Sequence, residues 1–336
     1  MPRSRTRLAD IAALAGVSVS TASRALNDSA SINDRTKQLI WKLAREHDYP
    51  FRRYMPAGPV GADSTIALVV PRPQAREGQL SDPFLLELLA GVGDAARERG
   101  CDVLVSHFMP TSYDDLSAAM DTSRADGVIF FGQSTLHHAF NRLAGTDARF
   151  VVWGAQLPDQ AYGSVGSDNL VGGRRAALHL ARLGRRRIVF LGDTEAPEVT
   201  QRLRGYFEAL ERSGLETDQQ LVVESHFTLE SSEASVDALI GRGVAFDGVV
   251  AASDVIALGA IRALQRSGRN VPSDVSVVGY DDISFARYAR PALTTVSQDA
   301  ARAGRLLVSK LLDSAGEDLR SERLATDLIV RESCGG

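Results

Sequence analysis

The chain has 336 residues, of which 44% are hydrophobic, with a formal net charge of −4 and two cysteines. Its length predicts two or three domains, because single compact cores usually stop at roughly 100–200 residues. Its longest apolar runs, such as residues 66–70, are far shorter than the roughly 18 residues that a membrane helix needs. No secretory signal is recognised at the basic N-terminus, and Cys101 and Cys334 lie too far apart to suggest a disulfide framework. We therefore expect a cytoplasmic protein with no membrane partner.

The charge is unevenly distributed along the chain. Residues 1–59 contain ten lysines and arginines against five acidic residues, a net charge of +5, so the remainder carries −9. A basic segment on a larger acidic body predicts that one end of the chain approaches a polyanion. A basic tail that is merely solvated would give the same balance.

Three short helices are predicted near the N-terminus. Apolar residues recur at helical spacing between Leu8 and Ala15, and Gly16 ends this first helix. Ser18 is a suitable N-cap for a second helix, and Asn33 for a third. A glycine turn between the first two helices is typical of a helix-turn-helix, although any three-helix bundle gives similar apolar stripes.

The second predicted helix carries side chains suited to reading DNA. Its first turn has the light residues Val19, Ser20 and Thr21, and Arg24 follows one turn later. An arginine guanidinium can donate two hydrogen bonds to O6 and N7 of guanine, so Arg24 is the candidate for reading a base. The sequence thus predicts a DNA-binding headpiece.

Residues 8–27, which read LADIAALAGVSVSTASRALN, resemble the headpiece of the LacI/GalR family of bacterial repressors. The resemblance continues to Tyr49 and resumes beyond the linker along the remaining chain. It implies a transcriptional regulator, in the role of a repressor, that binds double-stranded operator DNA. By this resemblance, three residues read bases: Val19, Ser20 and Arg24. Five others would hold the phosphate backbone: Ser18, Thr21, Ser23, Asn27 and Thr36.

Residues 50–63 form a predicted linker that is rich in proline and arginine. In the family that the chain resembles, this stretch becomes a helix on DNA and inserts a leucine into the minor groove. Here an alanine stands at the matching position, and Pro56 would interrupt the helix. Arg52 and Arg53 are instead candidates for a narrow minor groove, with Met55 as the nearest wedge. A flexible tether with solvated arginines is the alternative interpretation.

Beyond the linker, strand-length apolar runs alternate with helical stretches in two successive series. Repeated βα units predict parallel sheets covered on both faces, and two series predict two lobes, as in the periplasmic-binding-protein fold that the resemblance implies. The fold class is therefore α/β, with a three-helix headpiece added. The predicted boundaries are 1–49 for the headpiece, 50–63 for the linker, and 64–336 for an effector-binding and dimerisation domain, with 64–163 and 298–325 in the first lobe and 164–297 and 326–336 in the second.

The cleft between the lobes is the predicted ligand site, because ligands of such sheets bind beyond the carboxyl ends of the strands. Polar and aromatic residues follow several predicted strands, a mixture that suits the hydroxyls and C–H faces of a pyranose. The expected effector is a mono- or disaccharide or a sugar derivative. By resemblance, the effector-binding positions are Pro83, Phe84, Trp153, Ser167, Arg202, Phe227, Ser253, Asp281 and Gln298.

Three positions bear on which effector is bound. Gly154 replaces an acidic residue used by some sugar repressors, and Ser253 stands where asparagine is frequent. Ala196 stands where the purine-sensing branch of the family has a second arginine, which disfavours a purine. Taken alone, Arg202 could be a surface residue and Asp281 a turn residue, and their joint placement at strand ends is what indicates a site.

No enzyme chemistry, cofactor or metal is expected. Residues 91–96 match the dinucleotide pattern GxGxxA but continue a predicted helix rather than open one. The adjacent His137 and His138 lack the spacing of a helical metal pair. A solute-binding transport protein would not need the headpiece, and a nucleotide-dependent enzyme would have a glycine loop where residues 71–73 read Pro-Arg-Pro. The last strand-like run, residues 328–330, leaves no heptad segment after it, so we expect a homodimer on a pseudo-palindromic site.

Overall fold

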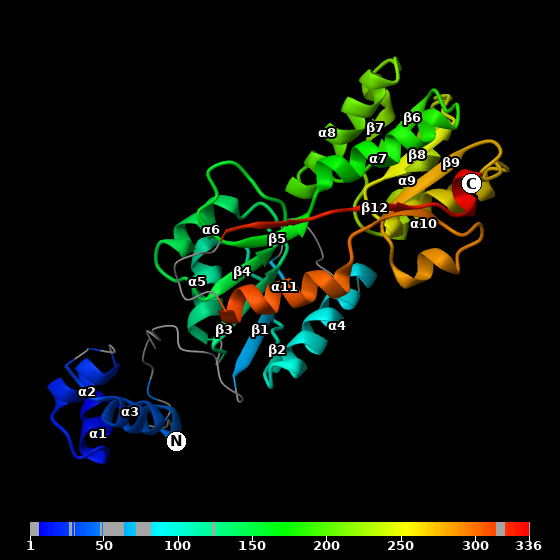
Figure 1. Ribbon diagram of the computed structural model, residues 1–336. Coiled ribbons are helices and arrows are strands. Elements are labelled where there is room, and N and C mark those ends of the chain that lie inside the picture. Colours follow the sequence, from blue (N-terminus) through cyan, green and yellow to red (C-terminus); the bar gives the residue numbers. More distant parts are fainter. Residues whose placement is uncertain are drawn as a thin grey trace. The chain divides into compact units, whose positions relative to one another are not determined.

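The computed structural model describes residues 7–26, 29, 31–47, 49, 64–71, 82–122, 125–313 and 320–335. Contacts divide the chain into two compact units, one of Met1–Val60 with Ala315–Glu317 and the other of Gly61–Ser314 with Asp318–Gly336 (Figure 1). No helix within the described ranges is long and apolar enough to cross a membrane. The predicted linker at 50–63 lies outside the described residues.

The first unit contains the three predicted helices, α1 (Leu8–Leu14), α2 (Val19–Leu26) and α3 (Asp34–Glu46). Their apolar stripes meet in one small core, in which Ile11, Ala22 and Ile40 are completely buried. Gly16 ends α1 with a φ of +66°, a backbone conformation that favours glycine.

Side-chain caps fix where the second and third helices begin. Ser18 Oγ accepts a hydrogen bond from the backbone N–H of Thr21 at 3.1 Å, and Asn33 Oδ1 accepts one from Thr36 at 2.8 Å. Each cap satisfies a backbone donor that the first turn of a helix leaves unpaired. The caps predicted from the sequence are therefore present.

The first lobe of the second unit is built on a six-stranded parallel sheet. Along the sheet, its strands are β11 (Glu322–Leu324), β5 (Ser164–Ser167), β4 (Phe150–Trp153), β3 (Gly127–Phe131), β1 (Thr65–Val69) and β2 (Asp102–Val105). Helices α4 (Pro83–Glu98) and α11 (Ala300–Asp313) pack on one face, and α5 (Tyr113–Thr122) and α6 (His137–Ala144) on the other. Covering both faces explains why the central strands β1, β3 and β4 are almost wholly apolar.

The second lobe has a sheet of the same size, parallel except for β12, which runs antiparallel to β10. Its strands, along the sheet, are β12 (Asp327–Ile329), β10 (Thr294–Ser297), β9 (Ser276–Asp281), β8 (Gly248–Ala251), β6 (Ile188–Leu191) and β7 (Val222–Val223). Two helix pairs pack against it: α7 (Asn169–Arg182) with α8 (Pro197–Arg212), and α9 (Leu229–Gly241) with α10 (Asp254–Arg266). Short 3₁₀ turns complete it: η1 (Gln219–Leu221), η2 (Ser284–Arg287) and η3 (Glu332–Cys334). The two sheets confirm the predicted α/β class.

The chain crosses between the sheets three times: after β5, after β10, and between β11 and β12. The predicted lobe boundary between residues 163 and 164 is wrong, because β5 pairs with β4 and β11 in the first sheet. The first crossing therefore follows Ser167. The correction matters for the site, since it places the ends of β5 and β10 together at the crossings.

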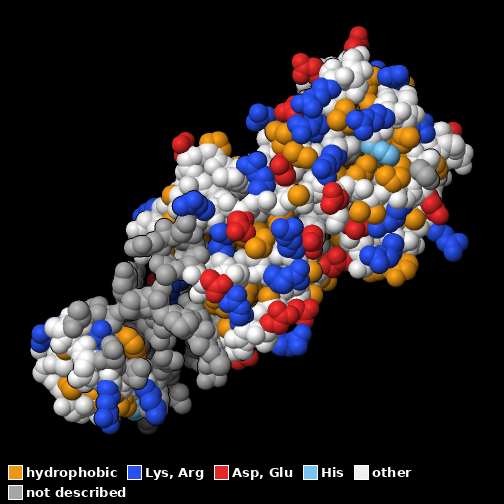
Figure 2. Space-filling model, in the orientation of Figure 1, with side chains coloured by type: hydrophobic (Ala, Val, Ile, Leu, Met, Phe, Trp, Pro, Cys, Tyr) orange, Lys and Arg blue, Asp and Glu red, His pale blue; other side chains and the backbone are white. Residues whose placement is uncertain are grey.

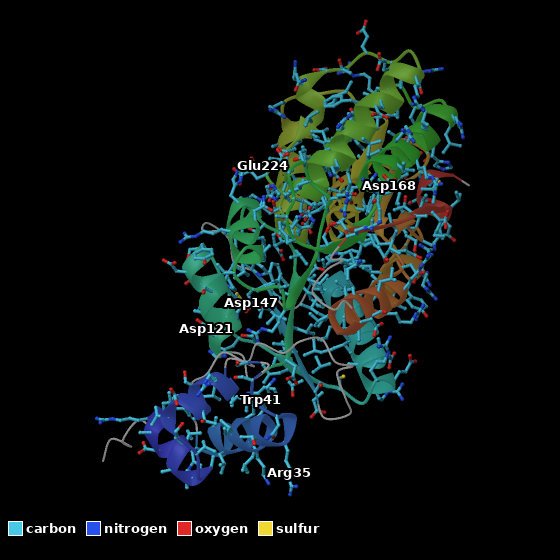
Figure 3. The ribbon with its side chains drawn as sticks, turned by 60° about the vertical axis from the view of Figure 1, so that its left-hand side comes forward. Arg35, Trp41, Asp121, Asp147, Asp168 and Glu224 are labelled. Atoms are coloured by element: carbon cyan, nitrogen blue, oxygen red, sulfur yellow. The ribbon has the colours of Figure 1, made fainter. Side chains whose placement is uncertain are left out.

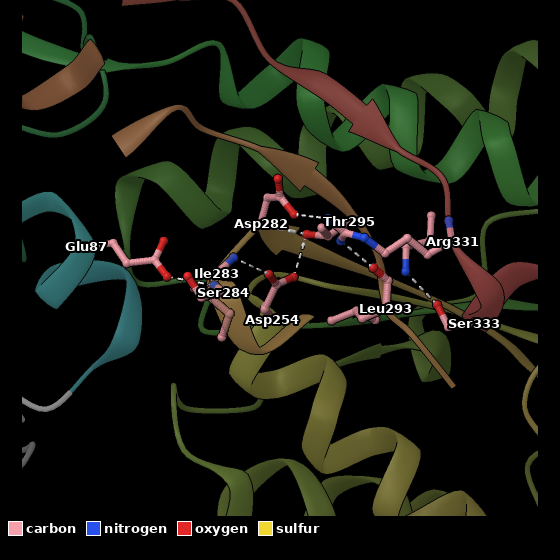
Figure 4. Close-up of polar contacts among 10 residues, drawn as sticks. Glu87, Asp254, Asp282, Ile283, Ser284, Leu293, Thr295, Arg331 and Ser333 are labelled. Atoms are coloured by element: carbon pink, nitrogen blue, oxygen red, sulfur yellow. Dashed lines mark hydrogen bonds and ion pairs between the residues drawn. The ribbon is translucent and has the colours of Figure 1, made fainter. Parts of the chain in front are cut away.

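The buried carboxyl group of Asp254 links the segment that follows β9 to strand β10 (Figure 4). Asp254 accepts hydrogen bonds from the backbone N–H of Ile283, at 2.9 Å, and from the hydroxyl of Thr295 on β10. Nearby, Asp282 forms an ion pair with Arg331 at 2.6 Å. These contacts hold the segment that follows β9 against β10.

Helices α7 and α8 approach each other through glycines. A Cβ at Gly205 would overlap the backbone oxygen of Leu170, and a Cβ at Gly173 would overlap the backbone oxygen of Arg202. This close approach sets the position of Arg202 on α8 relative to α7, and no larger residue fits.

We expect Gly205→Ala to lower the free energy of unfolding by about 1–3 kcal/mol, because the added methyl must push two backbones apart. The matched control is Gly241→Ala at the end of α9, where a Cβ would meet no atom within 4 Å. That change should be neutral or stabilising by up to about 1 kcal/mol. Urea unfolding measures both, and equal losses in the two variants would contradict the packing account.

The pH dependence of stability tests the buried Asp254 network. Burial raises the pKa of Asp254 from 3.8 to about 8. The folded protein thus keeps a proton that the unfolded chain releases, so this contribution to stability is complete below about pH 4 and is lost as the pH rises toward 8. Between about pH 5 and pH 8, the urea midpoint of Asp254→Asn should fall less than that of the wild type.

Asp94→Asn is the control for that experiment, because Asp94 is exposed and pairs with Arg97 on the surface. It should follow the wild-type pH profile. Parallel profiles for Asp254→Asn and the wild type would show that Asp254 does not titrate in this window.

Candidate functional site

The first turn of α2 presents polar and apolar side chains to solvent. Ser18, Ser20 and Arg24 are exposed, and Val19 is 49% exposed although it is apolar. The Ser18 hydroxyl lies 2.9 Å from that of Ser20 and 2.8 Å from that of Thr21, so the turn forms one polar cluster. Light side chains on an exposed helix start leave room for close approach to base edges.

Arg24 lies one turn beyond this cluster. Its Nε donates to the backbone oxygen of Ser20 at 3.2 Å, which directs the guanidinium along the same face of α2. Lysine and arginine side chains are visible on the face of the headpiece drawn in Figure 2, and Arg35 on α3 is also exposed (Figure 3). This surface suits a polyanion such as DNA.

Other predicted DNA contacts are less exposed or are not described. Ser23 and Thr36 are partly buried, and the N–H of Thr36 is used in the cap of α3. The remaining predicted contacts lie outside the described residues: Asn27, Arg52, Arg53 and Met55.

In the second unit, a chain of hydrogen bonds joins the ends of three strands from both sheets. Gln298, which follows β10, is 2% exposed. Its Oε1 accepts from the hydroxyl of Ser167 at 2.6 Å, and its Nε2 donates to the carboxylate of Asp281. The predicted residues Ser167, Gln298 and Asp281 are therefore brought together, one from the first sheet and two from the second.

Arg202 lies nearby as a buried guanidinium, 5% exposed. Its Nε donates to Asn169 Oδ1 at 2.8 Å, its Nη1 donates to the backbone oxygen of Ala252, and its Cζ lies 3.7 Å from the ring centroid of Tyr280. The contact with Tyr280 is a cation–π interaction, and the three contacts together fix the guanidinium plane.

Burial and neighbouring charges act in opposite directions on Asp281. Burial raises its pKa well above the ordinary value, and the carboxylates of Asp254 and Asp82 add to the rise, while the charge of Arg202 lowers it. The pKa of Asp82 is also raised by burial. A hydroxylated ligand can satisfy such carboxyl groups in either protonation state, because a hydroxyl both donates and accepts.

Aromatic surface is provided by Phe84 and Trp153, each 8% exposed. Their ring centroids lie 5.6 Å apart with a tilt of 42°. Phe84 follows Pro83 in the first turn of α4, where Asp82 is the N-cap and accepts from the N–H of Leu85 at 3.1 Å. Trp153 ends β4, so this pair lies at the same strand-end edge that Ser167 occupies.

Ser253 and Phe227 have evident roles in supporting the lobe. The hydroxyl of Ser253, which is 2% exposed, caps α10 by accepting from the N–H of Ile256 at 3.2 Å. Phe227 is partly buried against the core, directly before the N-cap of α9. Their predicted effector contacts stay predictions.

Sequence reasoning missed several residues of this region. Asp82 precedes a proline at a helix start, which is a readable N-cap signal. Asn169, Tyr280 and Asp254 carry no local signal, because their roles depend on partners far away in the sequence.

One group of described residues has the chemistry of metal ligands. Donor atoms of Asp193, Glu224 and His226 lie within 4.8 Å of one another, beyond the ends of β6 and β7. Of the three, Glu224 is labelled in Figure 3. His226 Nδ1 lies 3.6 Å from a carboxylate oxygen of Asp193, which is an ion pair when the histidine is protonated. His137 Nδ1 lies 3.0 Å from the hydroxyl of Tyr162.

Comparisons with known proteins agree with this organisation. A family model described as bacterial regulatory proteins, lacI family, matches residues 7–50, and one described as a periplasmic binding protein-like domain matches residues 177–334. The HTH-type transcriptional regulator CelR of Thermobifida fusca is 35% identical, with 98% of this chain and 99% of that protein covered. The HTH-type transcriptional regulator DegA of Bacillus subtilis is 30% identical, with 97% and 95% covered.

A solved structure described as the transcriptional regulator CelR–cellobiose complex has a TM-score of 0.69 and 33% identity, and covers 98% of this chain and 100% of the other. These relatives are transcriptional regulators, and their similarity extends over both units. The chain therefore belongs to the LacI family of bacterial regulatory proteins.

Proposed function

We propose that this LacI-family regulator binds operator DNA as a homodimer and that a sugar bound between its lobes changes its operator affinity. The observation that carries the proposal is the hydrogen-bond chain from Ser167 through Gln298 to Asp281, beside the buried Arg202. Charged and amide groups at facing strand ends, together with Phe84 and Trp153, match the needs of a pyranose.

The similar solved structure described as the CelR–cellobiose complex supports a sugar as the effector class. A purine is disfavoured because Ala196, the N-cap residue of α8, offers no side-chain group for it. Mono- and disaccharides are therefore the first ligands to test. The sugar is proposed to contact Pro83, Phe84, Trp153, Ser167, Arg202, Phe227, Ser253, Asp281 and Gln298.

We propose that the base contacts with operator DNA are made by Val19, Ser20 and Arg24. A role on operator DNA also supports a cytoplasmic location and a protein without enzyme activity. The phosphate backbone and the minor groove would be contacted by Ser18, Thr21, Ser23, Asn27, Thr36, Arg52, Arg53 and Met55.

A thermal-shift screen with cellobiose, D-glucose, D-galactose and D-ribose tests the effector class. A sugar at 100 times its dissociation constant should raise the free energy of unfolding by about 2.7 kcal/mol. Sugars that leave the melting temperature unchanged at millimolar concentration, while a purine base raises it, would contradict the proposal.

Arg24→Ala should weaken binding to the specific operator by about 1–3 kcal/mol and relax the preference at one base pair of each half-site. The control is Arg97→Ala, which removes the same charge from the exposed surface of α4 and should leave operator affinity unchanged. Fluorescence anisotropy with operator and random duplexes measures both. Equal weakening on the two duplexes would identify Arg24 as a phosphate contact instead.

Arg202→Ala and Asp281→Asn should each lower sugar affinity by several-fold to a thousandfold, roughly 1–4 kcal/mol, because ligand hydroxyls lose their partners in a buried site. Operator binding without sugar should survive both changes. Arg174→Ala is the control, since Arg174 pairs with Glu208 on neighbouring helices at 2.9 Å. If folded Arg202→Ala lost operator binding but kept its sugar affinity, the assignment of this site would be wrong.

A further inference from the structure

The turn between β3 and α6 contains a glutamine, Gln133, whose amide nitrogen has two hydrogen-bond partners and whose amide oxygen has none among the described residues. Gln133 is completely buried. Its Nε2 donates both protons, one to the backbone oxygen of Ala155 and one to the hydroxyl of Tyr162, each at 2.7 Å. Its Oε1 is buried and accepts no hydrogen bond within the described structure. Buried acceptors almost always have a donor, so this oxygen indicates a partner from outside the chain.

The orientation of the amide is fixed by its neighbours. The Tyr162 oxygen accepts from Gln133 Nε2, and burial raises the pKa of Tyr162 to about 12, so the phenol keeps its proton. His137 Nδ1 lies 3.0 Å from the same hydroxyl as its second partner. Because the backbone oxygen of Ala155 can only accept, rotating the amide would bring Oε1 against another acceptor, so Oε1 stays on the side away from Ala155.

The backbone of this turn has two residues with positive φ angles. Gly132 has a φ of +101° and Ser134 a φ of +49°, a conformation that serine rarely adopts. The hydroxyl oxygen of Ser134 is also buried without a hydrogen bond among the described residues. Strained non-glycine residues persist where the surroundings hold them, and they cluster at binding sites.

The turn is attached to the end of β4, where Trp153 lies. The N–H of Gly132 donates to the backbone oxygen of Trp153 at 3.0 Å. Gly154 follows Trp153, and a Cβ there would lie 2.7 Å from Gln133 Oε1. The glutamine amide therefore fills space beside β4 that any other residue at position 154 would occupy, at the strand-end edge that carries the proposed sugar site.

We propose that Gln133 Oε1 accepts a hydrogen bond from one hydroxyl of the bound sugar and makes that hydroxyl a requirement for binding. The inference rests on the proposed function and deepens it. Because the acceptor is neutral and cannot turn to donate, it selects a donor at one position of the ligand and rejects analogues that lack that donor.

Isothermal titration with cellobiose, D-glucose, D-galactose and D-ribose identifies a binding sugar, and its monodeoxy analogues then test the inference. The wild type should bind the parent sugar at least about 10-fold more tightly than one of these analogues. Gln133→Met, which keeps the side-chain length, should lose about 10-fold or more in affinity for the parent and discriminate little against that analogue.

Gln160→Met is the matched control in the same lobe. The Oε1 of Gln160 accepts from the N–H of Leu157 at 3.0 Å, and its Nε2 donates to the backbone oxygen of Tyr162 and to Ser321 Oγ, each at 2.8 Å. Its amide oxygen and both amide protons therefore already have partners within the chain. This variant should keep the wild-type discrimination. Should Gln133→Met fail to fold, Gly154→Ala replaces it, because its Cβ displaces the amide and should lower affinity for the parent sugar alone.

The outcomes separate the two proposals. A wild type that binds none of the sugars would overturn the proposed effector class and this inference with it. A wild type that binds a sugar, with a Gln133→Met variant that keeps both its affinity and its discrimination, would overturn the role of Gln133 alone. In that case a buried water between Gln133 and Ser134 would be the partner.

Discussion

The amide of Gln298 joins two sheets that the chain builds separately. It accepts from Ser167 at the end of β5 and donates to Asp281 at the end of β9, and it is buried. Leaving a buried amide without a hydrogen-bond partner costs free energy. A change in the arrangement of the lobes must therefore either keep these hydrogen bonds or replace them with others. A sugar hydroxyl is such a replacement. The proposed ligand site and the joint between the lobes thus share the atoms of Ser167, Gln298 and Asp281.

The second lobe holds its half of this joint under strain. Asp281 has a φ of 120° and Asp282 a φ of 59°, values that aspartate seldom adopts. Contacts on either side maintain them: Asp254 holds the N–H of Ile283, and Asp282 pairs with Arg331. The β9 end is therefore positioned before a ligand arrives, which lowers the entropy that binding must overcome.

Local patterns predicted much of this architecture. The apolar stripe from Leu8 to Ala15 and the caps at Ser18 and Asn33 are properties of neighbouring residues, and the headpiece helices follow from them. The alternation of strands and helices likewise predicted two parallel sheets. The edge of the first lobe was misplaced because β5 reads Ser-Val-Gly-Ser, which lacks the apolar character of a buried strand.

The site could be predicted only in part, because it depends on contacts between residues that lie far apart in the sequence. Ser167, Gln298 and Asp281 were predicted from a family resemblance and their places at strand ends, whereas no pattern indicated that Gln298 bridges the other two. No sequence pattern indicated Gln133, because its proposed role depends on Tyr162 and on the absence of a side chain at Gly154. Asp254 resembles an ordinary helix-start acid until Thr295 is placed beside it.

Sugar and operator are proposed to bind to different states of one coupled molecule. Coupling between two ligands is reciprocal, so the factor by which sugar changes operator affinity must equal the factor by which operator changes sugar affinity. The direct test uses the full chain, an operator duplex selected from random DNA, and the sugar that stabilises the protein. The sugar should change operator affinity by about 5-fold or more, and the change in operator anisotropy should reach its midpoint near the dissociation constant of the sugar. A sugar that binds tightly but leaves operator affinity unchanged would contradict it.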